Sequence, residues 1–257
     1  MITIYKPRGR AREYSPLALN IYNRCDHNCT YCYLPVIQKK WGIVLADIQP
    51  RQYILEDLRR VAKFYSFGKQ VLMCFSGDPY CRADKKYKIT ENVLKILLEN
   101  NVSTAILTKG GKRCLRDIGL FKEFKTIKVG ATLTFIKEKD SRHWEKNASL
   151  PEDRFKTLEK LKEEGIMTWV SLEPVIDPEQ TLKIIDRTHE FIDQYKVGKL
   201  NHFENDTNWK DFGIRAIDKL NEYGKKFYIK NDLAKFIPVN KMTKNQRDAD
   251  YLAIEGS

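Results

Sequence analysis

The chain has 257 residues, 42% of them hydrophobic and 31% charged, which suits one α/β barrel-sized domain with a full core and not two. Its 46 Lys and Arg against 34 Asp and Glu give a formal net charge of +12, which either favours a polyanionic partner such as nucleic acid or simply marks a basic soluble protein. No run approaches the roughly 20 apolar residues of a membrane helix, and the start lacks the apolar centre of a signal peptide, so we expect a soluble, cytoplasmic protein with no membrane partner.

Residues 1–16 form a basic segment ahead of the first predicted strand, and we expect them to be an N-terminal arm. Basic side chains gather there and in two later groups, and any of the three could contact phosphates. The three groups are Lys6, Arg8, Arg10 and Arg12; Lys109, Lys112, Arg113 and Arg116; and Lys225, Lys226, Lys230, Lys235, Lys241, Lys244 and Arg247.

Short β-rich apolar runs alternate with helical patterns along the rest of the chain. Strands are predicted over 17–22, 71–75, 104–107, 127–133, 168–172, 197–200 and 227–229. Helices are predicted over 50–66, 90–100, 151–164, 179–195 and 209–223. This βα alternation predicts a parallel sheet, and its six or seven units indicate a partial (β/α) barrel over 17–240, with a polar tail over 241–257 that we expect to fray.

Three of the six cysteines follow the first strand directly, in the run LALNIYNRCDHNCTYCYLP. Without a secretion signal the cysteines should be reduced thiols, which favours metal binding or catalysis over disulfides. Cys25, Cys29 and Cys32 would hold three irons of a cubane and leave the fourth iron open for a small molecule. The alternative is a closed zinc site, for which the fourth ligand would come from His27 or from one of Cys74, Cys81 and Cys114.

The spacing CxxxCxYC after an N-terminal strand resembles the radical S-adenosylmethionine (SAM) superfamily. The resemblance implies a partial (β/α)6-type TIM barrel with a short C-terminal extension. It also implies a 4Fe-4S cluster whose open iron binds the amino and carboxylate groups of SAM. A reductant protein of the flavodoxin or ferredoxin type would supply the electron that cleaves SAM to a 5′-deoxyadenosyl radical. In the superfamily the aromatic residue at the position of Tyr31 lies near the adenine.

Later motifs extend the resemblance over roughly residues 17–200. The second strand ends in Ser76-Gly77-Asp78-Pro79, which is similar to the Gly-Gly-Glu-Pro element that binds the SAM amino group through backbone and carboxylate. The runs ILTKGGKRCLRDIGLF, VGATLTF, SRHWEKNASLPEDRFKTLEKLKEEGI and WVSLEPVID resemble the spore photoproduct lyase-like branch and related phage-associated proteins. Carried over by position, the residues that would line the SAM pocket are Thr108, Lys109, Thr132, Thr134 and Glu173.

The same branch suggests how a product radical would be quenched. Cys74, just before the carboxylate motif, matches the cysteine that returns a hydrogen atom, and Tyr31 and Tyr33 match tyrosines that help relay it. A thiol suits this role because its S–H bond is weak, although a lone buried cysteine also serves simply as a small apolar residue. Cys81 and Cys114 are alternative donors or inert.

The sequence therefore predicts a radical SAM enzyme that repairs or modifies a nucleobase in DNA or RNA, or a nucleotide precursor. A base in a duplex would have to be extruded into the barrel mouth, guided by phosphate contacts. Only 24 residues precede Cys25, fewer than in the lyase, so spore-lesion repair itself is not expected. The alternatives are a radical SAM enzyme acting on a peptide or small metabolite, and a zinc- or cluster-stabilised nucleic-acid-binding module without catalysis.

Overall fold

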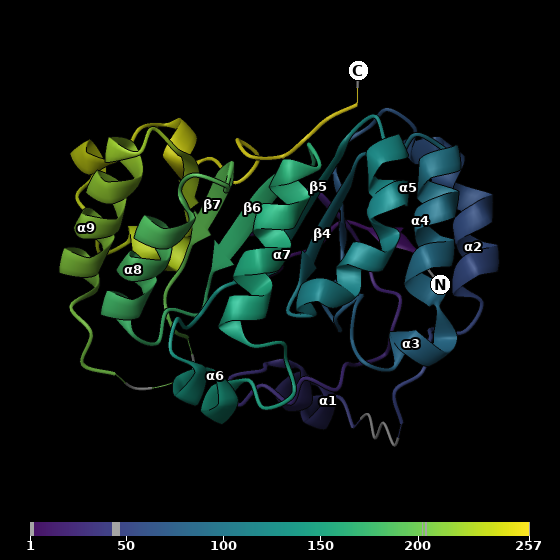
Figure 1. Ribbon diagram of the computed structural model, residues 1–257, viewed down its shortest axis with the longest axis horizontal. Helices are drawn as coiled ribbons and strands as arrows, with labels where there is room; N and C mark the ends of the chain where they lie inside the picture. Colours follow the sequence, from purple (N-terminus) through teal and green to yellow (C-terminus); the bar gives the residue numbers. More distant parts are fainter. Residues whose placement is uncertain (1–2, 43–46, 202, 204, 257) are drawn as a thin grey trace.

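The computed structural model describes residues 3–42, 47–201, 203 and 205–256, and within them the chain folds around one sheet of eight strands (Figure 1). The strands lie in sequence order: β1 (Ile4–Tyr5), β2 (Leu17–Leu19), β3 (Val71–Met73), β4 (Thr104–Thr108), β5 (Ile127–Thr132), β6 (Met167–Leu172), β7 (Gln194–Val197) and β8 (Lys226–Ile229). Strands β2 to β8 pair in parallel, β1 is antiparallel to β2, and β8 does not pair with β1. The open, mostly parallel sheet confirms the predicted partial barrel.

Helices cover the outer face of the sheet, as expected for βα units. The covering helices are α2 (Ile54–Val61), α4 (Ile89–Glu99), α5 (Ile118–Glu123), α7 (Pro151–Glu163), α8 (Pro178–Thr188) and α9 (Trp209–Glu222). Four shorter helices are α1 (Leu34–Lys40), α3 (Asp84–Tyr87), α6 (Glu138–Trp144) and α10 (Asn231–Ala234). The 3-10 turns are η1 (Gly9–Glu13), η2 (Ala62–Tyr65), η3 (Gly111–Asp117), η4 (Val239–Lys241) and η5 (Asn245–Arg247). No described helix has both the length and the apolar character to cross a bilayer.

The two faces of the sheet bury different side chains because residues alternate along each strand. A large apolar cluster fills the space between the sheet and the helices, whereas a small one, Leu72, Ala105 and Trp169, fills the barrel interior. Gly130 on β5 makes room for the Trp169 ring, since a Cβ there would lie 2.2 Å from the Trp169 carbonyl oxygen and 2.6 Å from the indole. The barrel is therefore a packed core.

Several predicted boundaries are wrong. The strand placed at 197–200 is β7 at Gln194–Val197, and the helix placed at 179–195 ends as α8 at Thr188. The error has a physical cause, because Lys196 points into the barrel from the middle of β7 and breaks the apolar pattern that marks a strand. The helix predicted over 50–66 begins at Ile54 and becomes 3-10 from Ala62.

Both ends of the chain pack on the barrel. Instead of a separate arm, the N-terminal segment adds β1 to the sheet, and Arg10 and Arg12 pair with Asp232 and Asp250. The polar tail does not fray within the described residues, because Leu252 and Ile254 are buried. The chain end lies at the opposite end of the barrel from α1 and α6 (Figure 1). The C-terminal segment thus closes the end where the strands begin.

Candidate active site

Cys25, Cys29 and Cys32 lie half-buried on the loop that follows β2, and none of them is in a disulfide. The last residue of α6 and the segment after it hold this loop: Thr30 N–H donates to the Trp144 carbonyl at 2.8 Å, and Asn147 N–H donates to the His27 carbonyl at 3.0 Å. The segment SRHWEKNAS, one of the runs that resemble the lyase-like branch, therefore positions the cysteines.

The three thiols share one short loop, in which the Cys32 N–H donates to the Cys29 carbonyl at 3.1 Å. Burial and then the charges of Asp78, Cys29 and Cys32 raise the pKa of Cys25 to about 12. Among the described residues no three His, Cys, Asp or Glu side chains come together as ligands of a single ion. Three free thiols spread over one loop fit the donor set of an iron–sulfur cubane, whose ligands bind different irons.

Beside the cysteines, Tyr31 is fixed by a buried ion pair that the sequence did not predict. The Tyr31 hydroxyl donates to Glu145, and Glu145 also binds Arg154 at 2.6 Å, with both charged side chains at most 1% exposed. The Lys109 ammonium lies 5.5 Å from the centre of the Tyr31 ring, and the Thr134 hydroxyl is 3.4 Å from Glu145. Burial and the Glu145 charge raise the pKa of Tyr31, so its phenol stays protonated.

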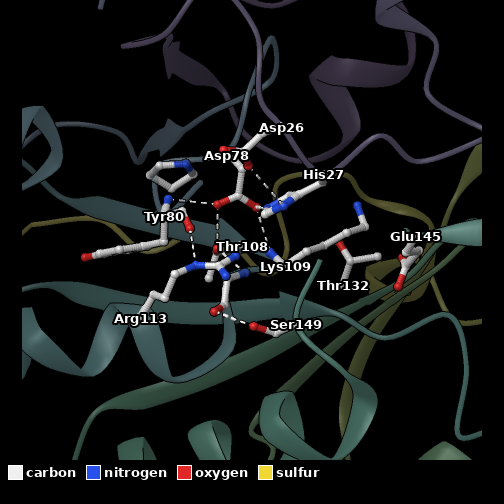
Figure 2. Close-up of polar contacts among 12 residues, drawn as sticks. Asp26, His27, Asp78, Tyr80, Thr108, Lys109, Arg113, Thr132, Glu145 and Ser149 are labelled. Atoms are coloured by element: carbon white, nitrogen blue, oxygen red, sulfur yellow. Dashed lines mark hydrogen bonds and ion pairs between the residues drawn. The ribbon is translucent and has the colours of Figure 1, made fainter. Parts of the chain in front are cut away.

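Asp78 is the centre of a second buried group (Figure 2). Its Oδ1 accepts from the Thr108 hydroxyl at 2.6 Å and from the Tyr80 N–H at 2.8 Å, while its Oδ2 accepts from the Lys109 N–H at 2.7 Å. His27 Nε2 lies 3.0 Å from Oδ2, at ion-pair distance. Burial opposes ionisation, but His27 and these donors hold the pKa of Asp78 below its ordinary value. Asp78 thus ties the cysteine loop to the ends of β3 and β4.

Glu173, after β6, belongs to a third group inside the barrel. It accepts from the hydroxyl of Tyr14 and from the ammonium of Lys230. The Tyr14 hydroxyl also lies 2.9 Å from the Ser171 hydroxyl, and Lys230 is 2% exposed. The charge of the Glu173 carboxylate is therefore balanced by a buried lysine. The sequence marked Lys230 only as one of a group of basic residues.

Cys74 and Tyr33 lie on the side of β3 near the cysteines. Cys74 is 7% exposed and packs with the apolar cluster between sheet and helices. The Tyr33 hydroxyl donates to the Phe75 carbonyl at 2.8 Å, and after burial the charges of Cys32, Cys25 and Cys74 contribute to raising its pKa. Tyr33 thus contacts the residue that follows Cys74. Cys81 and Cys114 are buried.

The remaining predicted residues bracket the same region. Ser76 N–H donates to Asn20 at 2.9 Å, and the Gly77 position abuts the Arg24 carbonyl, 3.2 Å from an added Cβ. The Thr132 carbonyl accepts from Arg154 at 2.9 Å. Asn20 and Arg154 were not predicted, because a polar residue at a strand end and an arginine in a charged helix look like solvated positions in sequence.

The basic group after β4 is partly engaged in contacts within the protein. Arg113 donates to the Tyr80 carbonyl at 2.7 Å, and Arg116 pairs with Asp84. Of the three side chains Lys112, Arg113 and Arg116, the two arginines therefore have structural partners.

Comparison with known proteins gives consistent matches. A model of the radical SAM superfamily matches residues 19–192. Uncharacterized protein MJ0683 of Methanocaldococcus jannaschii is 30% identical over 189 residues, 71% of this chain and 70% of that protein. Uncharacterized protein ORF301 of Acidianus two-tailed virus is 26% identical over 206 residues, 74% of this chain and 66% of that protein.

Solved structures show the same fold at low identity. Spore photoproduct lyase complexed with dinucleoside spore photoproduct superposes with a TM-score of 0.67 at 11% identity, covering 88% of this chain and 79% of the lyase. Streptococcus suis SuiB bound to S-adenosylmethionine gives a TM-score of 0.64 at 18% identity, covering 82% of this chain but only 50% of SuiB. Another SuiB structure holds its precursor peptide SuiA.

Proposed function

Because this chain belongs to the radical SAM superfamily, we propose that Cys25, Cys29 and Cys32 hold a 4Fe-4S cluster that binds and reduces SAM. The observation that carries this proposal is three free, half-buried thiols on one loop after β2, at the end of the barrel where chemistry sits in such folds. When bound, the cluster and SAM would supply a 5′-deoxyadenosyl radical, with the electron coming from a flavodoxin- or ferredoxin-type reductant.

The side chains around the cysteines suit the parts of SAM. The Tyr31 ring, oriented by Glu145, offers an aromatic face to the adenine, and Lys109 offers a cation to the methionyl carboxylate. The backbone carbonyls of Ser76 and Gly77 suit the ammonium group, and Thr132 and Thr134 suit the ribose hydroxyls.

Asp78, Thr108 and Glu173 were expected in the same pocket, but each already has partners. Thr108 donates to Asp78 and accepts from the Gly110 N–H at 2.8 Å, and Glu173 is held by Lys230. We therefore assign these three residues to holding the pocket walls.

For the substrate we propose a nucleobase in DNA, RNA or a nucleotide. Two observations support this class: the net charge of +12, and a fold shared with a lyase that binds a dinucleoside lesion. Within this proposal Cys74 returns a hydrogen atom to the product radical, with Tyr33 beside it. A peptide substrate, as in SuiB, is the competing class, and it offers no reason for the positive charge.

Anaerobic reconstitution tests the chemistry. We expect about four irons and four sulfides per chain, and 5′-deoxyadenosine that forms only with SAM and dithionite. Cys29→Ala should lose both, whereas Cys114→Ala, a buried cysteine away from the loop, should keep both. Stoichiometric zinc with no SAM cleavage would overturn the proposal. For the substrate, deuterium from labelled oligonucleotides should appear in 5′-deoxyadenosine; label arriving only from peptides would establish the competing class.

A further inference from the structure

The helix that follows the cluster cysteines exposes apolar side chains instead of burying them. No residue of α1 is buried; Val36 is 71% exposed and Trp41, directly after the helix, is 73% exposed. Ile37 is 43% exposed. Large apolar side chains gathered on a surface in this way mark a binding site more often than isolated ones do.

α6 lies at the same end of the barrel as α1 (Figure 1). The loop ahead of α1 and the end of α6 are joined by the hydrogen bond from Thr30 to Trp144. Lysines lie on α1 or on and beside α6: Lys39, Lys40, Lys137, Lys139 and Lys146. All five are exposed, and within the described ranges none of them forms an ion pair. We call Val36, Ile37, Trp41 and these five lysines the mouth surface.

We propose that the mouth surface docks a nucleic-acid strand with unstacked bases, single-stranded or locally opened, beside the cluster. This inference rests on the proposed function and adds where the substrate is held. Trp41 and its apolar neighbours suit the faces of bases, which stack on aromatic side chains whatever their sequence. The five lysines suit phosphates, whereas an apolar peptide would leave their charges unmatched.

Oligonucleotide binding to the reconstituted full-length protein tests this surface. The probes are short fluorescein-labelled single-stranded DNA and RNA, followed by anisotropy over a range of KCl concentrations. We expect Trp41→Ala to weaken binding by about tenfold at one salt concentration. The double variant Lys39→Ala/Lys40→Ala should lower the slope of log K against log salt by about 1.4, which corresponds to two phosphate contacts on a single strand.

The matched control is Lys63→Ala/Phe64→Ala, which removes another exposed lysine–aromatic pair. Phe64 is 74% exposed with the Lys63 ammonium 5.2 Å from its ring centre, and both lie on η2, outside the mouth surface. We expect this variant to bind as the wild type does. Iron content and melting temperature establish that each variant folds, and Trp41→Phe, which keeps an aromatic ring, should restore most of the binding.

The outcomes separate this inference from the proposed function. If the wild type binds oligonucleotides and the mouth variants bind equally well with the same salt slope, the mouth surface is wrong and the proposed function stands. If the wild type cleaves SAM but binds neither DNA nor RNA, this inference falls and the proposed substrate is restricted to a free nucleotide. Displacement of the oligonucleotide by an uncharged apolar peptide, with no salt dependence, also overturns the inference.

Discussion

The carboxylate of Asp78 shows how far a motif can be trusted at the scale of one residue. Its position after β3 matches an element that binds an amino group, yet its two oxygens receive three hydrogen bonds and the His27 imidazole. A carboxylate offers about four acceptor positions, of which three are filled, and the His27 ring lies 3.0 Å from Oδ2, beside the fourth. Little room therefore remains for the ammonium of SAM. Because Asp is shorter than Glu, the Asp78 carboxylate stays among its buried hydrogen-bond donors and does not extend into the pocket.

Asp78→Asn therefore tests whether Asp78 has a structural role in the pocket or binds SAM directly. The amide turns one acceptor into a donor that faces the Lys109 N–H and His27, which should cost about 1–3 kcal/mol of unfolding free energy. The Kd for SAM of the protein that retains its cluster should change little. Denaturant unfolding and equilibrium SAM binding measure the two effects. A large loss of SAM affinity with unchanged stability would identify Asp78 as a ligand after all.

Cys74 makes the second prediction at this scale. Burial raises the pKa of Cys74 to about 12, so at neutral pH the side chain keeps the S–H bond that a hydrogen donor needs. Cys74→Ala should lower the yield of finished product per 5′-deoxyadenosine severalfold, whereas Cys114→Ala should leave that ratio unchanged. Both products are quantified by chromatography in single-turnover reactions. Equal ratios in all three proteins would remove Cys74 from the reaction.

At the scale of elements, the segment from α6 to α7 joins the cysteine loop to the sheet. Glu145 binds Tyr31 in the loop, and Arg154 on α7 binds both Glu145 and the Thr132 carbonyl at the end of β5. Removing one partner of a buried ion pair leaves the other charge without compensation in a medium of low polarity. The orientation of Tyr31 therefore depends on α7.

Arg154→Ala should accordingly lower the unfolding free energy by about 3–5 kcal/mol. Arg142→Ala, which breaks the exposed pair with Glu138 on α6, should cost only about 0.3–0.5 kcal/mol. Urea unfolding of both variants against the wild type provides the measurement. Similar costs for the two variants would mean that Glu145 is not held as a buried charge.

The elements also show what the sequence can and cannot predict. Strands and helices that bury a periodic apolar face, such as β5 and α7, were predicted within a few residues. α1 buries nothing and α6 buries only Ser141, so neither has the periodic signal on which prediction depends. The cysteines were predictable because their spacing is dictated by the cluster, whereas Glu145 and Arg154 find each other only through the fold.

At the scale of the whole molecule, the C-terminal segment closes the end of the barrel opposite the cysteines. Its Leu252 carbonyl accepts from the buried Lys128 ammonium, and Ile254 N–H donates to Gln70 at 3.3 Å. The composition of this segment alone predicts a loose polar tail. The fold holds it in place because buried lysines inside the barrel require oxygen partners, and the segment supplies one.

Leu252→Ala tests this closure. The side chain is 1% exposed, and its truncation should cost about 2–5 kcal/mol of unfolding free energy. Tyr251→Ala is the neighbouring control, because that side chain is 36% exposed and should contribute little. Thermal and denaturant unfolding distinguish a packed closure from a tail, for which both substitutions would be neutral.

The buried Lys196 makes the stability of the whole barrel depend on pH. Its ammonium donates to the carbonyls of Glu13 and Tyr14 at 2.6 and 3.1 Å. Burial and then repulsion from Lys230 lower its pKa to about 7, although Asp250 and Glu13 oppose the shift. Between pH 7 and the ordinary lysine value near 10.5, the unfolded chain binds a proton that the folded chain does not. The unfolding free energy should therefore rise with pH across this window and level off below pH 7, where both states are protonated.

The slope from this one group should approach about 1.4 kcal/mol per pH unit. Denaturant unfolding from pH 6 to about pH 9.5, an upper limit set below the ordinary pKa of tyrosine and lysine, measures it in the wild type and in Lys196→Met. The methionine keeps the apolar stem but cannot titrate, so the stability difference between the two proteins should shift in favour of the wild type as pH rises. Lys226→Met, at the exposed start of β8, should follow the wild-type curve. A third carbonyl, that of Ala249, lies 3.5 Å from the Lys196 ammonium, so three acceptors match its three protons. A stability difference between wild type and Lys196→Met that stays constant with pH would mean that these carbonyls keep the ammonium charged throughout.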